Sequence, residues 1–404
     1  MKRQRQYKPE DPLHCLIDTV VWSNALAMLH TDRADSSNTQ LLITGVILEA
    51  DRDGKTPLHH ACRTRKHFSH RTWLVKADCD GGTALHYACQ SKQGSSHPTW
   101  PVQLVDRLLA VGGKELVMMA DHDGMTALHH ACRLQGNFEV ISRLIAVGGL
   151  ELVLLTDRLG RTALHYALTM ENPQMASSKL KIVERLITIG GPELIMKAET
   201  RGRGMTALIL AIQYACREQG SWLELLDQLI ALGGINLVLK ADVNGNSTLI
   251  EALCWNGTGA WSEIIDRLID AGGPALIFMV SRSGRTALHV AIATGCSFEV
   301  VDKLISAGGR KLVLKPDYWC GRTALHLACS PPGMLSWSVD PQHRIEIVHR
   351  LIEVGRQKLV LTTDLQRRQT ALQLECLKEN PCPEIVDRLM EVGDEKLHTL
   401  ITTN

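Results

Sequence analysis

The chain has 404 residues, with 44 Lys and Arg against 43 Asp and Glu, and this balance argues against a nucleic-acid-binding or anionic-membrane protein. Hydrophobic residues make up 45% of the chain and aromatic residues only 4%, which favours a core of packed helices over a β-sandwich. No apolar run approaches the ~18 residues of a membrane-spanning helix. We therefore expect a globular protein that has no membrane partner.

In chain order, residues 1–12 are basic and polar and are expected to form a flexible tail rather than a secretory signal, because no apolar stretch follows them. Residues 13–50 are predicted to cap the domain that follows, with Trp22 and Leu26 shielding its first apolar face. Residues 51–398 form a repeat array, and residues 399–404 form a C-terminal tail.

One phrase recurs throughout the array. GMTALHHAC at 124–132 returns as GRTALHYAL at 160–168 and as GRTALHLAC at 321–329. Alignment on the first hydroxyl residue of the phrase gives nine anchors, which are Thr56, Thr83, Thr126, Thr162, Thr206, Ser247, Thr286, Thr323 and Thr370. Their spacing varies around 40 residues, which indicates a solenoid with loop insertions, numbered here as repeats one to nine.

Each unit has the same internal order. In repeat three, Asp121 to Gly124 predicts a tight turn, and Thr126 is placed to cap a short helix that begins with Ala-Leu-His. After a polar break, FEVISRLIAVGG predicts an amphipathic helix that ends at the glycine pair 148–149. A further helical turn is expected after the glycines, with its Leu-Val or Leu-Ile pair packed between repeats.

The repeated unit resembles the ankyrin repeat over about residues 51–398, because it has the order turn, helix, loop and helix, with T-[AP]-L-H at the first helix. The resemblance implies an all-α, curved right-handed solenoid of stacked helix pairs, with hairpin fingers and first helices on the concave face. Three features depart from the family pattern: the connection after the glycines is longer, repeats two, four and eight carry insertions between their helices, and repeats five, six and nine lack the His.

A metal site was considered at four His-Cys pairs spaced i, i+3, which are His59–Cys62, His86–Cys89, His129–Cys132 and His326–Cys329. The competing interpretation is that each His hydrogen-bonds the cap Thr and each Cys is a small buried residue. Pairs that lie a whole repeat apart cannot share one zinc ion, so we expect no metal and no cofactor. Without a C-x-x-C motif, the twelve Cys indicate reduced thiols and a cytoplasmic protein, with the nucleus as the alternative.

The second helix carries an acid-base pair at nearly every level, such as Asp106-Arg107 and Asp302-Lys303. Stacked surface ion pairs explain this column better than a binding site. We found no nucleotide-binding or hydrolase motif that survives the repeat interpretation, so the chain is predicted not to be an enzyme.

The candidate binding residues flank the turn glycines, at positions that usually contact partners in proteins resembling ankyrin repeats. They are Arg158, Arg161, Arg201, Arg203, Arg282, Arg285, Tyr318, Trp319, Arg322, Arg367 and Arg368. The framework Asp residues beside them are expected to be held by local turn hydrogen bonds, which leaves the Arg forks available.

The sequence thus predicts a non-enzymatic scaffold that binds an acidic or phosphorylated protein segment on its concave face. Two alternatives stay open. The first is an adaptor that presents a client to an enzyme such as a ubiquitin ligase, with insertions containing Trp100 and Trp337 as the second docking surface. The other is the regulatory portion of a larger enzyme.

Overall fold

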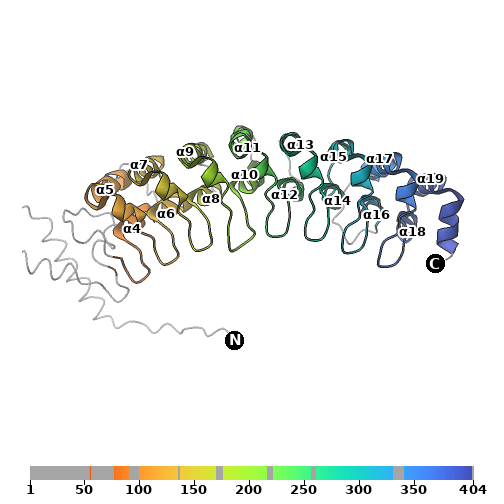
Figure 1. Ribbon diagram of the computed structural model, residues 1–404, viewed down its shortest axis with the longest axis horizontal. Coiled ribbons are helices and arrows are strands. Elements are labelled where there is room, and N and C mark those ends of the chain that lie inside the picture. Colours follow the sequence, from red (N-terminus) through yellow and green to blue (C-terminus); the bar gives the residue numbers. More distant parts are fainter. Residues whose placement is uncertain are drawn as a thin grey trace, which may run out of the picture. The chain divides into compact units, whose positions relative to one another are not determined.

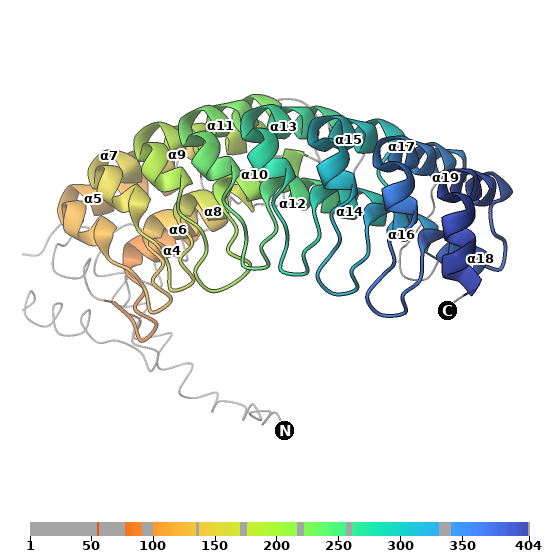
Figure 2. The same cartoon turned by 45° about the vertical axis from the view of Figure 1, so that its right-hand side comes forward.

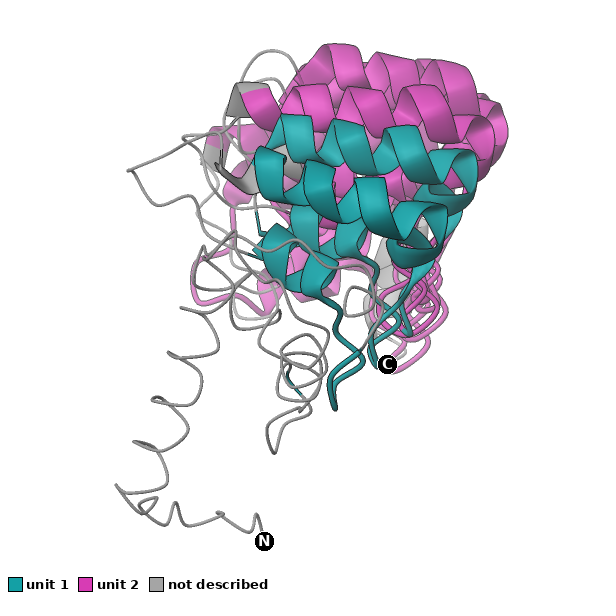
Figure 3. Cartoon of the chain, turned by 90° about the vertical axis from the view of Figure 1, so that its left-hand side faces the viewer, with its two compact units in different colours: residues 1–158 teal, residues 159–404 magenta. Residues whose placement is uncertain are grey.

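The structure is a computed structural model that describes residues 55, 77–90, 100–134, 137–169, 176–215, 222–255, 261–330 and 341–402. The chain divides into two compact units, residues 1–158 and 159–404, which Figure 3 shows in different colours. The predicted cap at 13–50 and the repeat anchored at Thr56 lie outside the described residues.

Short inner helices alternate with longer outer helices in both units (Figure 1). Unit 1 contains α4 (Ala84–Gln90), α5 (Trp100–Met118), α6 (Ala127–Arg133) and α7 (Phe138–Leu154). Unit 2 contains α8 (Ala163–Leu168), α9 (Ala176–Ile195), α10 (Ala207–Ala215), α11 (Trp222–Val238), α12 (Thr248–Cys254), α13 (Trp261–Ile277), α14 (Ala287–Ala293), α15 (Phe298–Val313), α16 (Ala324–Cys329), α17 (Pro341–Val360), α18 (Ala371–Cys376) and α19 (Pro383–Thr402).

The predicted all-α solenoid of helix pairs is confirmed within these residues. Extended pairing among them is limited to isolated bridges, such as Ala120–Thr126 and Val280–Thr286, at the bases of the loops between successive pairs. None of the described helices is long and apolar enough to cross a membrane. The count of nine repeats stays a prediction, because eight helix pairs fall within the described part of the chain.

The core lies between neighbouring repeats. In repeat three, Leu128 of the inner helix α6 and Ile141 and Leu144 of the outer helix α7 are fully buried. The inner helices contact the inner helices of adjacent repeats, as in α4 with α6 and α14 with α16, and the outer helices pair in the same way. Each repeat therefore depends on its neighbours for burial of its apolar stripe.

Six of the described outer helices, α5, α7, α9, α11, α13 and α15, contain a pair of glycines, and the two glycines have different physical roles. A Cβ at the first glycine, Gly148, would lie 2.5 Å from the Cβ of Leu152 in the short helix that follows. The second, Gly149, has φ 62° and ψ −154°, which is a backbone region that essentially only glycine adopts. The kink turns the chain so that Leu152 and Val153 are fully buried, as predicted for the Leu-Val pair.

Fingers are the loops that connect each outer helix to the next inner helix, and in unit 2 they project on one side of the stack (Figure 2). In the α16 finger (residues 315–323), Asp317 Oδ1 accepts hydrogen bonds from the N–H groups of Cys320 at 3.0 Å and Arg322 at 3.1 Å. Neighbouring fingers are joined by backbone bonds, including Tyr318 N–H to Ser283 O at 3.0 Å and Leu365 N–H to Cys320 O at 2.7 Å. The fingers are therefore built as a connected row.

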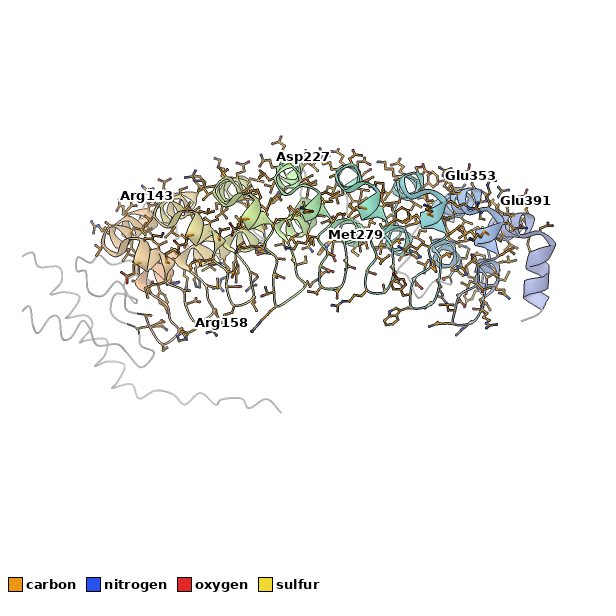
Figure 4. All side chains as sticks on the ribbon, in the orientation of Figure 1. Arg143, Arg158, Asp227, Met279, Glu353 and Glu391 are labelled. Atoms are coloured by element: carbon orange, nitrogen blue, oxygen red, sulfur yellow. The ribbon has the colours of Figure 1, made fainter. Side chains whose placement is uncertain are left out.

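Ion pairs link successive outer helices, as the acid-base column predicted. Arg267 Nε lies 2.9 Å from Asp227 Oδ1, and Arg350 Nε lies 2.6 Å from Asp302 Oδ1. Figure 4 shows Asp227 and Glu353 of unit 2 on the edge opposite the fingers, and Arg143 and Arg158 on opposite edges of unit 1. These exposed pairs support the stack weakly, since each is worth about 0–1 kcal/mol.

Removal of backbone strain at Arg356 should stabilise the protein. Arg356 takes the place of the second glycine in α17, with φ 56° and ψ −160°. We expect Arg356→Gly to raise the free energy of unfolding by about 1 kcal/mol, because only glycine adopts this conformation without strain. Arg356→Ala keeps the Cβ and should change little, and Gly309→Ala should be destabilising. Urea denaturation measures all three; a glycine variant no more stable than the alanine variant would refute the strain.

Candidate functional site

The candidate finger residues differ widely in accessibility. Among the candidate residues, those that are exposed in unit 2 are Arg201, Arg203, Arg282, Tyr318, Trp319, Arg367 and Arg368. Arg158 is also exposed, and it belongs to unit 1. Arg161 and Arg285 are half-buried. Arg322 is only 8% exposed, so it offers little surface to a partner.

The expectation that the Arg forks are available fails for the arginines that follow a turn glycine. Arg322 Nε lies 3.4 Å from Asp364 Oδ2, and Arg285 Nε lies 4.0 Å from Asp317 Oδ2. In both cases the Asp belongs to the next finger. The same slot in repeat four holds Arg161, whose guanidinium lies 4.6 Å from the Tyr166 ring centroid. These arginines help hold the repeats in place.

The arginines of repeat five lie at different positions because its finger is two residues longer than the finger of repeat six. Glu199 precedes the turn glycine Gly204 by five residues, whereas Asp242 precedes Gly245 by three. Arg203 Nη2 donates to Oε1 of the buried Glu251 of α12 at 2.7 Å, while its own side chain stays half exposed. Arg203 therefore lies at the surface and also links repeats five and six.

In the unit-2 fingers that precede α10, α12, α14, α16 and α18, acidic side chains lie deeper in the fold and arginine side chains lie at the surface. The framework Asp residues 242, 317 and 364 are buried and accept hydrogen bonds from backbone N–H groups of their own turns. Every fully exposed charged side chain in these five fingers is an arginine. The side chains of Arg201, Arg282 and Arg367 take part in none of the ion pairs among the described residues. The surface of this finger row is thus basic, although the whole chain is close to neutral.

Large apolar side chains are exposed at the tips of the α16 finger and the α18 finger (residues 362–370). The exposed fraction is 64% for Tyr318, 77% for Trp319 and 74% for Leu365. Sequence reasoning found the aromatic pair but missed Leu365. It could have been found, because Leu365 follows Asp364 just as Tyr318 follows Asp317.

Buried histidines join four of the described inner helices, α4, α8, α14 and α16, to the next finger. Thr286 N–H donates to His289 Nδ1 at 3.3 Å, so Nδ1 is the unprotonated nitrogen and Nε2–H is left to donate to Arg322 O at 3.1 Å. His86, His165 and His326 bind their Thr and a carbonyl of the next repeat in the same way. Both ring nitrogens of these four residues are therefore occupied, and for His86 and His326, which belong to the His-Cys pairs, this supports the cap interpretation.

Burial controls the protonation of this network. It lowers the pKa of His86, His289 and His326 from 6.5 to about 4, because the charged imidazolium is poorly solvated inside the stack. Cys89, Cys132 and Cys329 are buried beside the histidines. At neutral pH these imidazoles are uncharged and the neighbouring thiols are buried, so the histidines and cysteines of the inner helices have a structural role.

Repeats five and six lack the histidine link. Thr206 and Ser247 cap their helices directly, each accepting a hydrogen bond at 3.3 Å from the N–H of the Ile that replaces the His. Here the side-chain link to the next repeat is the Arg203–Glu251 ion pair. Glu251 Oε2 is buried and has no hydrogen-bond partner among the described residues. This stretch is therefore joined by partly exposed charges and contains an unsatisfied acceptor.

The first part of the chain is similar to a known repeat family. A family model described as ankyrin repeats (3 copies) matches residues 27–97 and 101–187. The first match begins within the segment that sequence analysis assigns to a cap, so that boundary stays a prediction. A comparison with curated proteins gives no significant match.

Two solved structures match parts of the chain. The ankyrin repeat domain of Bcl-3, described as a unique member of the IkappaB protein family, is 22% identical over 66% of this chain and 99% of its own, with a TM-score of 0.46. The second is a chain from the complex of the predatory endopeptidase Bd0816 of Bdellovibrio bacteriovorus with the immunity protein Bd3460. It is 22% identical over 56% of this chain and 97% of its own, with a TM-score of 0.40.

Repeats five and six should open before their neighbours. Because they lack the buried histidine link, we expect amide hydrogen exchange to show the least protection of any interior repeat between about residues 200 and 260. Exchange followed by mass spectrometry at neutral pH measures this for each segment. Equal protection across the interior repeats would show that the Arg203–Glu251 pair replaces the histidine link fully.

Acid should destabilise the protein through its buried histidines. Their pKa is lower in the folded chain than the unfolded value of 6.5, so the stabilisation is complete above that pH and is lost as the pH falls towards 4. At about pH 5 the loss is on the order of 2 kcal/mol for each such histidine.

His289→Gln tests this dependence, because Gln373 already caps Thr370 in repeat nine by accepting its N–H at 2.8 Å. The variant should lose about 2 kcal/mol less stability than the native chain between pH 7 and about pH 5, measured by urea denaturation. His122→Gln, at an exposed finger position, is the control. If His289→Gln keeps the native pH dependence, this histidine is not its source.

Proposed function

We propose that the chain, which is similar to ankyrin repeats over residues 27–97 and 101–187, binds an acidic or phosphorylated segment of a partner protein along the unit-2 fingers and inner helices. A stack of repeats presents many side chains on a prearranged surface. Its fingers are already joined by backbone hydrogen bonds, so binding orders little of this chain.

The observation that carries the proposal is the charge of the exposed finger surface. The acids of the unit-2 framework are buried and hydrogen-bonded, whereas Arg201, Arg282 and Arg367 extend into solvent. A partner therefore meets guanidinium groups and not the balanced charge of the sequence. Arg forks match carboxylate and phosphate oxygens in two-point hydrogen bonds, which supports an anionic partner.

The pairing of the buried Arg322 and the half-buried Arg285 reduces the number of arginines assigned to partner contact. Arg322 and Arg285 pair with Asp364 and Asp317, so the proposal assigns them to support of the surface. Direct contact is assigned to Arg201, Arg282 and Arg367. A partner that crosses these positions would span several fingers, and its affinity would come from many modest contacts and a few central ones.

Charge reversal at two exposed finger positions tests the proposal. Arg282→Glu with Arg367→Glu should weaken binding of a partner recovered by affinity purification by at least about tenfold, because central Arg contacts often contribute ~2 kcal/mol or more. Binding of the native chain should also weaken as salt rises, mainly through a slower association rate. Biolayer interferometry over a range of salt concentrations measures both effects.

The matched control is Arg185→Glu with Arg310→Glu. Both residues are exposed in unit 2, in α9 and α15. This variant carries the same change in net charge and should bind normally. Loss of binding in the control with normal binding in the finger variant would assign the partner to another surface.

A further inference from the structure

The α16 and α18 fingers share one exposed apolar tip surface, defined by Tyr318, Trp319 and Leu365. Single exposed apolar residues are common on proteins, but a cluster of three large ones on adjoining loops is not. Each is at least 64% exposed, so folding of the described chain does not account for them.

Backbone hydrogen bonding joins the two fingers that carry the three residues. Leu365 N–H donates to Cys320 O at 2.7 Å, which ties the α18 finger to the α16 finger. The Leu365 side chain covers Gly321, where an added Cβ would lie 2.4 Å from Leu365 Cγ. Tyr318 covers Gly284 in the same manner, at 2.3 Å from ring to Cβ position. Each tip therefore rests on the finger before it.

The tip surface is held rigidly from below. Asp317 and Asp364 each accept two backbone N–H bonds from their own turns, and Asp364 also pairs with Arg322 of the α16 finger. Rigid aromatic and aliphatic groups bind with little loss of conformational entropy. Such preorganised residues are the ones that dominate the energy of protein interfaces.

Basic side chains border the tip surface on both sides along the chain. Arg282, in the α14 finger, follows Ser281, and its N–H is bound to Asn244 O at 2.8 Å. Arg367 lies within the α18 finger itself. Both are exposed, the α14 finger has Ser281 at the position of the framework acid, and Asp364 of the α18 finger is buried. An apolar centre with a cationic border is complementary to an apolar side chain flanked by acids.

We propose that the tip surface binds an acidic protein segment through a large apolar side chain of that segment, which packs against Trp319 and Leu365 while Arg282 and Arg367 bind flanking carboxylates. This inference rests on the proposed function and specifies the partner further. A charge-only partner would leave the apolar tips in water. A segment with an apolar anchor buries them and gains affinity that does not depend on salt.

A protein segment fits the surface better than an anionic bilayer. Among the described unit-2 fingers, the α12 finger exposes one apolar side chain, Val243, at 42%, whereas the larger Tyr318, Trp319 and Leu365 are 64% to 77% exposed and lie on the α16 and α18 fingers. The α10 and α14 fingers expose Arg201 and Arg282. A membrane surface would meet the polar tips of this connected row as well as the apolar ones. A narrow chain can contact the α16 and α18 fingers alone.

The test uses the full chain and three short fluorescein-labelled peptides of equal charge. The first contains Glu and Asp residues around one central Phe, the second has Ser in place of the Phe, and the third replaces acids by phosphoserine around the same Ser. Fluorescence anisotropy should show that the Phe peptide binds at least about tenfold more tightly than either peptide without an anchor. Trp319→Ala with Leu365→Ser should remove this difference and leave binding of the Ser peptide unchanged.

The matched control is Leu232→Ser with Ile235→Ser, which removes two apolar side chains of α11 that are 43% and 51% exposed. It should bind the Phe peptide as the native chain does. Equal thermal unfolding of both variants and the native chain establishes that the fold is intact. A control variant that loses the Phe preference would assign the anchor to another surface and overturn the inference.

The remaining outcomes separate the inference from the function on which it rests. Equal affinity for the Phe and Ser peptides, with binding still lost in Arg282→Glu with Arg367→Glu, overturns the apolar anchor and keeps the acidic partner. Binding that survives the Arg reversal overturns both. Phosphatidylserine vesicles that bind the native chain but not the Trp319→Ala, Leu365→Ser variant, without any Phe preference, would assign the tips to a membrane and overturn the inference.

Discussion

In four of the described repeats, the hydrogen-bonded link from threonine through histidine to the next repeat fixes the base of the following finger. The Thr N–H fixes the acceptor nitrogen of the ring, and this leaves the other nitrogen to donate to a carbonyl at the base of the next finger. The link is buried, so water competes with it little. Because the finger base is tied to the inner helix in this way, the turn above it can hold its Asp, its arginine and its tip residue at fixed positions.

Much of this fold could be predicted from the sequence, because its signals are local or periodic. The Thr cap, the apolar stripes and the glycine pairs each act within one repeat, and recurrence makes them visible. The availability of the arginines could not be predicted in this way. Arg322 and Asp364 lie 42 residues apart, and only the stacking of two fingers brings them together. The separation of buried acids from exposed arginines likewise depends on the side-chain geometry of each turn. Leu365 was missed because it does not belong to the residue types sought at interfaces.

The last two repeats have other residues at positions where the earlier described repeats have glycine. Arg356 and Asp394 adopt the kink conformation of the second glycine, and Arg368 has φ 54° at the position of the turn glycine. The kink glycines have no neighbouring atom within 4 Å of an added Cβ, so a side chain there meets no clash and costs only backbone strain. At the turn glycines, the tip residue of the following finger occupies the space. No described finger follows Arg368, and the steric reason for glycine is absent there.

The histidine link ends on a main-chain oxygen, and this has a consequence for how such a surface can diversify. The residues that supply the carbonyl are two methionines, Met125 and Met205, one arginine, Arg322, and one glutamine, Gln369. A main-chain acceptor is the same whichever side chain is attached to it. Substitutions at the finger base can therefore alter the shape and charge of the surface without breaking the hydrogen bond between repeats. The partner that is bound can change while the stacking of the repeats is kept.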